Sequence, residues 1–298
     1  MYLNTLEVTL TPRANTEPYN LRLNPAALDV LSLIFEFKVV TAWQMARFLT
    51  QKDESKYIYL KLRRMWQAGL LESFKIYAGT RAGMPVYYML SKRGLKALSE
   101  QGRYDPDIIR TYPQPKTLFS LNIFRHEAQI AELASQEVKN GSDNFAISFK
   151  GEASSLAREA RSDKSIEVFT PDYTAFYRVG ELEERIYTEF ERTNKSTIAM
   201  GRKLERYHSY LDPNTRGHTT LRFIFQTPQM EQSFWLNLLL QRLQMMQKVR
   251  LLTTNLMLLE SHEQFLEPIY TSEQTVKLTK ERSIGVDLST RTKLFSFL

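Results

Sequence analysis

The chain has 298 residues, 43% hydrophobic and 24% charged, which is typical of a globular protein long enough for two domains. It contains no cysteine, which excludes a disulfide scaffold, a cysteine zinc site and a cysteine nucleophile. The net charge of +7 favours polyanionic partners. Residues 1–110 hold 16 Lys and Arg against 10 Asp and Glu, whereas residues 111–298 hold 24 against 23. Contact with a polyanion is therefore expected in the first third of the chain.

The chain shows no signal for export or for membrane insertion. Its first residues lack a basic segment that leads into an apolar core, and no run of about 18 apolar residues occurs. We therefore expect no secretory leader, no membrane span and a cytoplasmic location.

Residues 1–24 are predicted to form an N-terminal arm with a short strand. Three helices should follow. The first begins after Asn24 and Pro25, the second is capped by Thr41, and the third begins near Asp53 and stops at Gly69.

Two strands, residues 70–78 and 84–90, then flank a loop with glycine at each end, and Ser91 caps a closing helix. The order of three helices, a hairpin and a helix predicts a winged helix-turn-helix over residues 25–103.

Residues 104–117 contain three prolines and are predicted to be a linker. Residues 118–298 are predicted to form an α/β domain with a mixed sheet and a C-terminal extension, in an α+β protein overall. Its expected elements are helix 118–140, strand 145–149, a strand pair at 165–179 and 184–192, helix 195–211, strand 221–227 and helix 231–249.

The third helix of the first domain has the pattern of a DNA-recognition helix. Apolar Ile58, Leu62 and Met65 recur on one face and should anchor it to the domain core. Cationic and aromatic side chains on its other faces, with one Arg at the hairpin tip, are the candidate DNA-binding residues: Lys56, Tyr57, Lys61, Arg64 and Arg81. A solvated basic face is the alternative interpretation.

Two carboxylates on the predicted strand 184–192 face the same side, because Glu189 and Glu191 are two residues apart. If this strand pairs with the preceding one, Asp172 converges with Glu189. Such a carboxylate pair suits Mg²⁺. Surface ion pairs with neighbouring Lys and Arg are the alternative.

The carboxylate motifs of the second half of the chain are similar to those of a known group of proteins. The Pro-Asp strand and the Glu-x-Glu strand, between two helices, resemble the PD-(D/E)xK nuclease superfamily. More narrowly, a winged helix followed by "RHEAQIAEL", "PDYTAFYRV", "YTEFERTNKS" and "RKLERYHSYL" is similar to the replication-relaxation family of plasmids and other mobile elements. The resemblance covers residues 25–227. It implies a role in replication initiation, DNA relaxation or mobilisation, with double-stranded DNA and replication or mobilisation proteins as partners.

Carried over residue by residue, the resemblance implies that Asp172 and Glu189 hold Mg²⁺ or Mn²⁺ if the site is active. Where the superfamily has a lysine, this chain has Glu191. Lys203 in the following helix is the candidate for a displaced ammonium group, and Tyr207 lies one turn further on. The candidate catalytic residues are Asp172, Glu189, Glu191 and Lys203.

Three functions stay open at this point. The first is a DNA-binding protein with a degenerate nuclease-like domain, the second a Mg²⁺-dependent endonuclease. The third is a winged-helix transcription regulator whose second half dimerises or senses a ligand. The methionine-rich residues 238–249 suit either a core or a homodimer face.

Overall fold

The structure is a computed structural model with a mixed α+β fold. It describes residues 8–11, 23–76, 85–141, 146–152, 170–179, 182–193, 195–210, 218–240, 250–261, 269–272, 276–278, 284–286 and 292–293. The chain divides into two compact units. The first comprises Met1–Lys139 and Gly151–Arg158, and the second comprises Asn140–Lys150 and Glu159–Leu298.

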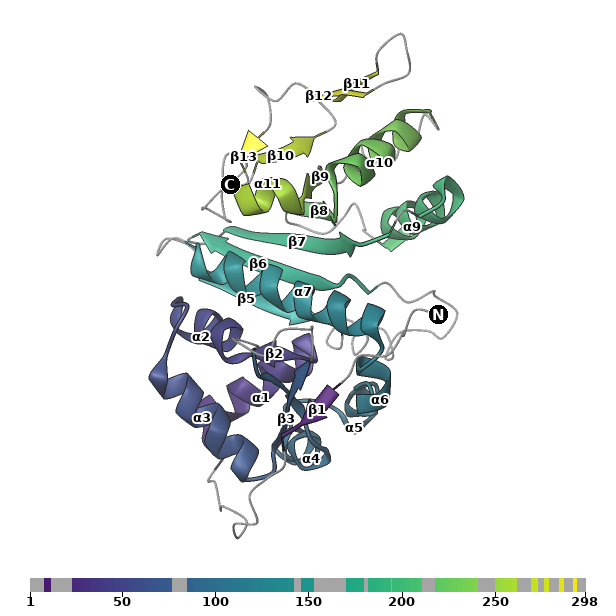
Figure 1. Ribbon diagram of the computed structural model, residues 1–298. Coiled ribbons are helices and arrows are strands. Elements are labelled where there is room, and N and C mark those ends of the chain that lie inside the picture. The colour runs from purple at the N-terminus through teal and green to yellow at the C-terminus, as the bar shows by residue number, and fades with distance from the viewer. Residues whose placement is uncertain are drawn as a thin grey trace. The chain divides into compact units, whose positions relative to one another are not determined.

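After a short strand at residues 8–10, the first unit has three helices, two paired strands and a further helix in the predicted order (Figure 1). A two-residue strand that was not predicted lies between the first two helices. Its helices are α1 (Pro25–Phe37), α2 (Ala42–Thr50), α3 (Lys56–Gln67), α4 (Lys92–Glu100), α5 (Pro106–Ile109), α6 (Pro115–Leu118) and α7 (Leu121–Lys139). Its strands are β1 (Val8–Leu10), β2 (Val40–Thr41), β3 (Leu71–Ile76) and β4 (Tyr87–Leu90). They form an antiparallel sheet in the order β1-β3-β4-β2.

Side-chain caps fix the beginnings of the first helices, as the sequence predicted for α1, α2 and α4. Asn24 Oδ1 accepts a hydrogen bond from the backbone N–H of Ala27, and Thr41 forms a reciprocal capping box with Gln44. The prediction that Asp53 caps α3 is wrong, because Ser55 takes that position.

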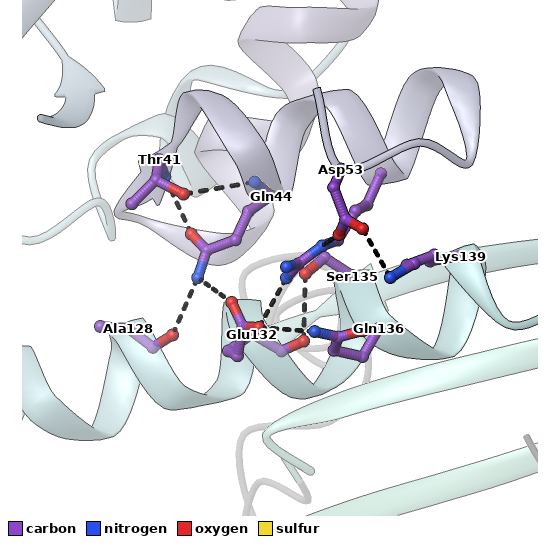
Figure 2. A network of polar contacts seen from close by, with 9 residues as sticks. Thr41, Gln44, Asp53, Ala128, Glu132, Ser135, Gln136 and Lys139 are labelled. Carbon is purple, nitrogen blue, oxygen red and sulfur yellow. Dashed lines mark hydrogen bonds and ion pairs between the residues drawn. The ribbon is translucent and has the colours of Figure 1, made fainter. Parts of the chain in front are cut away.

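Asp53 instead belongs to a polar network that joins α2 to α7 (Figure 2). Arg47 donates to Asp53 Oδ1 at 2.7 Å and to Glu132 Oε1 at 2.5 Å, and Lys139 lies 2.6 Å from Asp53 Oδ2. Gln44 adds a hydrogen bond to Glu132 Oε2 at 3.0 Å. Hydrogen bonds from Lys139 and Arg47 lower the pKa of Asp53. Two cations therefore compensate the acid that precedes α3.

Residues 104–117, predicted to be a linker, contain α5 and α6 and lie in the first unit. Prolines occupy the first positions of both helices, where a missing N–H costs nothing. Tyr112 donates to the backbone oxygen of Lys38 at 2.7 Å and accepts from Leu90 N at 3.0 Å. The boundary between the two units falls after Lys139.

A short return segment completes the first unit. The N–H of Gly151 donates to Glu36 Oε2 at 2.8 Å, and Lys38 Nζ lies 2.6 Å from Glu127 and 2.5 Å from Glu152. Burial disfavours the Lys38 ammonium, but the charges of Glu127 and Glu152 outweigh it and raise its pKa. Any side chain at residue 151 would collide with the backbone, since an added Cβ would lie 2.3 Å from Glu36 O.

The second unit is built on a seven-stranded sheet in the order β13-β10-β9-β8-β7-β6-β5 (Figure 1). Its strands are β5 (Ala146–Gly151), β6 (Tyr173–Val179), β7 (Leu182–Glu191), β8 (His218–Phe225), β9 (Arg250–Asn255), β10 (Ile269–Ser272) and β13 (Thr292–Lys293). Its helices are α9 (Thr197–Tyr210), α10 (Pro228–Leu240) and α11 (Leu256–Ser261), and β11 (Val276–Leu278) pairs with β12 (Ile284–Val286). No helix in the described ranges is long and apolar enough to cross a membrane.

The sheet of the second unit is mixed, as expected. β6 and β7 are antiparallel, whereas β7, β8 and β9 run parallel with α9 and α10 as connections. Strand β9 was not predicted, and residues 241–249 of the predicted last helix lie outside the described residues. One face of β8 packs with α9 and α10 in an apolar core that includes Leu204, Phe223, Phe225, Phe234 and Trp235.

Gly94 in α4 offers a test of the packing in the first unit. A Cβ at this position would lie 2.3 Å from the backbone oxygen of Leu70. We expect Gly94→Ala to lower the free energy of unfolding by about 1–3 kcal/mol, despite the better helix propensity of alanine. Lys96→Ala on the exposed side of α4 should change it by less than about 0.5 kcal/mol. Equal urea midpoints for the two variants would contradict this packing.

Candidate functional site

The two carboxylates of β7 point into the second unit. Glu189 pairs in register with Phe223, and Glu191 with Phe225, so all four share the sheet face that α9 and α10 cover. The side chains of Glu189 and Glu191 are only 7% and 4% exposed. These carboxylates are therefore buried groups rather than members of a solvated strand face.

Asp172 reaches the same place from the neighbouring strand. Tyr173 at the start of β6 pairs with Thr188, so the preceding residue, Asp172, stands opposite Glu189. Its Oδ2 accepts a hydrogen bond from the backbone N–H of Phe190 at 2.6 Å. The structure thus brings Asp172 and Glu189 together across the β6–β7 pair.

Lys203 of α9 supplies the positive charge of the site. Its Nζ lies 2.5 Å from Glu189 Oε2 and 2.5 Å from Glu191 Oε1. Met200, Leu204 and Tyr207 pack α9 on the apolar core and direct Lys203 to the carboxylates. The ammonium group also lies 5.7 Å from the ring centroid of Phe223.

Two further donors, Tyr207 and Lys195, complete the carboxylate–lysine site. It comprises Asp172, Glu189, Glu191, Lys195, Lys203 and Tyr207. The Tyr207 hydroxyl donates to Glu189 Oε1, so both oxygens of Glu189 are engaged. Lys195 lies 2.8 Å from Glu191 Oε1 and is partly exposed. Sequence reasoning missed Lys195, although its spacing of four residues from Glu191 was visible.

The site has a characteristic protonation pattern. Burial raises the pKa of Glu189 to about 7, with Asp172 adding to the rise and Lys203 opposing it. Burial also disfavours the charged form of Lys203, but the charges of Glu189, Glu191 and Asp172 outweigh it and raise its pKa. Burial and the charge of Glu189 raise the pKa of Tyr207, which keeps its hydroxyl a proton donor.

The predicted DNA-binding residues lie on α3, except for Arg81, which falls outside the described residues. Lys56, Tyr57 and Arg64 are exposed and Lys61 is partly exposed, while Ile58, Leu62 and Met65 are buried. The helix also exposes side chains outside the predicted set: Tyr59, Leu60 and Arg63. A helical projection of the sequence would have placed Leu60 and Arg63 opposite the buried stripe and Tyr59 on its flank.

The carboxylate–lysine site does not fit a divalent cation while Lys203 is in place. Carboxylate oxygens are suitable ligands for Mg²⁺. However, the two oxygens of Glu189 already accept from Lys203 and Tyr207, and Glu191 Oε1 accepts from Lys203 and Lys195. Within the described part of the chain, no group of three or more His, Asp or Glu residues is arranged to hold a metal ion. Lys203 therefore occupies the position in which the resemblance would place a cation.

Comparison of the chain with models of protein families, with curated proteins and with solved structures gives no match. Any functional assignment accordingly depends on the chain's own residues.

The raised pKa of Glu189 predicts a pH dependence of stability. The folded protein keeps this proton to about pH 7, whereas the unfolded chain loses it near the ordinary value of 4.5. Between these two values only the unfolded chain loses the proton, so the free energy of unfolding falls as the pH rises to about 7 and is constant above it. Glu189→Gln removes this contribution, so its urea midpoint should rise relative to wild type between about pH 5 and about pH 8. The exposed carboxylate variant Glu205→Gln should show no such trend.

Replacement of Lys203 should allow a divalent cation to bind at Glu189 and Glu191. Lys203→Met leaves Glu189 and Glu191 without their shared counter-ion, which should destabilise the protein by about 3–5 kcal/mol. Mn²⁺ at about ten times its Kd should then restore about 1.4 kcal/mol and raise the Tm by about 3 °C. Wild type and the double variant Lys203→Met/Glu189→Gln should not respond. Stabilisation of wild type by Mn²⁺ would show that Lys203 does not block the site.

Proposed function

We propose that this protein is a DNA-binding protein of a plasmid or other mobile element, acting in the cytoplasm in replication initiation, DNA relaxation or mobilisation. The observation that supports it is the composition of α3, whose 12 residues include four Lys or Arg and no Asp or Glu. A winged helix-turn-helix is the fold class that best accounts for the order of helices and strands around α3.

The way in which α3 packs on the first unit is suitable for a DNA-recognition helix. Ile58, Leu62 and Met65 are at most 2% exposed and fix one side of the helix to the core of the first unit. Exposed cations on the other sides can meet phosphates, and Arg can also read base edges. Arg47 and Lys139 neutralise Asp53, one of the two acids that precede the helix, whereas Glu54 stays exposed beside Ser55.

For the second unit we propose a nuclease-like domain whose carboxylate–lysine site is closed by Lys203. Its role would then be to position the protein on DNA or to contact a second copy or a replication or mobilisation protein.

A Mg²⁺-dependent endonuclease is the second candidate. Its support is that Asp172, Glu189, Glu191 and Lys203 come from three elements onto one sheet face. Asp172 and Glu189 would hold the ion, which requires Lys203 to move away from Glu189.

Duplex binding can be tested through its salt dependence. Replacing Lys56, Lys61 and Arg64 with alanine should weaken binding and reduce the slope of log K against log salt by about 0.9 for each phosphate that is no longer neutralised. The matched control replaces three exposed cations elsewhere in the first unit, Lys92, Lys96 and Arg110, and should change the slope little. Equal slopes for the two triple variants, with both folded by circular dichroism, would refute the assignment to α3.

Incubation of wild-type protein with supercoiled plasmid separates the two proposals for the second unit. The closed site predicts no cleavage with Mg²⁺, Mn²⁺ or EDTA. Cleavage that requires the metal and is lost in Asp172→Ala would establish the endonuclease instead.

A further inference from the structure

Helix α3 exposes aromatic rings as well as cations. Tyr57 is 63% exposed and Tyr59 is 51% exposed, and Leu60 next to Tyr59 is 37% exposed. Large apolar side chains grouped on a surface mark a binding site more often than a solvated face. Phosphate contacts alone would need only the cations of this helix, so the rings call for a separate explanation.

These side chains form one surface, which we call the aromatic–basic face: Lys56, Tyr57, Tyr59, Leu60, Arg63 and Arg64. At 100° per residue, Lys56, Leu60 and Arg63 project opposite the buried stripe, and Tyr57 and Tyr59 project on the two flanks. A ligand that crosses the face meets a ring on each side and cations between them.

The Tyr57 ring has a cation beside it. Lys61 Nζ lies 5.4 Å from the ring centroid and 3.4 Å from the Tyr57 hydroxyl. A phosphate bound by Lys61 would therefore bring its attached nucleoside close to the Tyr57 ring.

The charge of the face selects a polyanion. Helix α3 carries four Lys or Arg and no Asp or Glu. Of the two acids before it, Asp53 is paired with Arg47 and Lys139 and Glu54 is exposed, so the cations outnumber the acids. Among polyanions, only those with accessible aromatic faces can stack on the tyrosine rings. In a duplex the faces of the bases are covered by their neighbours, whereas unpaired bases stack on aromatic side chains irrespective of sequence.

We propose that the aromatic–basic face binds single-stranded DNA, with unpaired bases stacked on Tyr57 and Tyr59. The phosphates are held by Arg63 and Arg64 of the face and by Lys61 at its border. The proposal rests on the function assigned to α3 above and specifies its ligand: a locally unpaired strand in addition to the duplex.

The test uses the full chain, a labelled oligothymidylate of about 20 nucleotides and a duplex of the same length, at one fixed salt concentration. Replacing both Tyr57 and Tyr59 with leucine keeps apolar bulk but removes the rings. This variant should lower the ratio of single-strand to duplex affinity about tenfold, equivalent to about 1.4 kcal/mol. Replacing both with phenylalanine keeps the rings and should restore the ratio. Met257→Ala, at an exposed apolar side chain of the second unit, is the control for unspecific effects.

An unchanged affinity ratio in the leucine variant overturns the proposal, and so does a phenylalanine variant that is as weak as the leucine variant. Tighter binding of oligouridylate than of oligothymidylate overturns the assignment to DNA. These failures differ from failure of the proposed function. In that case the protein would bind neither strand form, or its duplex binding would be insensitive to replacement of Lys56, Lys61 and Arg64.

Discussion

Lys203 holds two buried carboxylates of β7 on the apolar face of the sheet, and the packing of the second unit depends on this ion pairing. Removing an ion from water costs several kcal/mol, so Glu189 and Glu191 could not both stay charged there without a shared cation. The same pairing fixes the rotation of α9, because Lys203 lies between Met200 and Leu204 on the helix. The direction of α9 in turn positions Tyr207 against Glu189.

The first unit also pairs carboxylates with cations, both at the exposed Asp53 and at the buried Glu127. Asp53 is paired with Arg47 and Lys139, and Glu127 with Lys38. In both units, cations from other elements of the fold compensate carboxylates, whereas the cations of α3 have no acidic residue on their own helix. Helix α3 therefore has four cationic side chains and no carboxylate, which gives its exposed surface a positive charge.

Local signals in the sequence predicted local structure well. Asn24, Thr41 and Ser91 cap helices because each offers a side-chain oxygen just before an apolar repeat, and the alternation in β7 identified the shared face of Glu189 and Glu191. Non-local effects defeated the same reasoning. Asp53 has the chemistry of a cap but pairs with cations on two other helices. The prolines of residues 104–117 were interpreted as a linker, although proline at a first helical position is itself a local start signal. Both faces of β7 are buried over residues 188–191, and burial of the face that carries Glu189 and Glu191 depends on the packing of α9, which no local pattern encodes.

The return of Gly151 and Glu152 to the first unit makes that unit discontinuous along the chain. During synthesis, Glu36 and Lys38 emerge from the ribosome long before Gly151 and Glu152, their partners, exist. The first unit can therefore reach its final hydrogen bonding only after β5 has been made. A gene fragment that stops at Lys139 would encode a first unit that lacks Gly151 and Glu152, so an exchange of gene segments would preserve the hydrogen bonding of this unit only if the segment extends past β5.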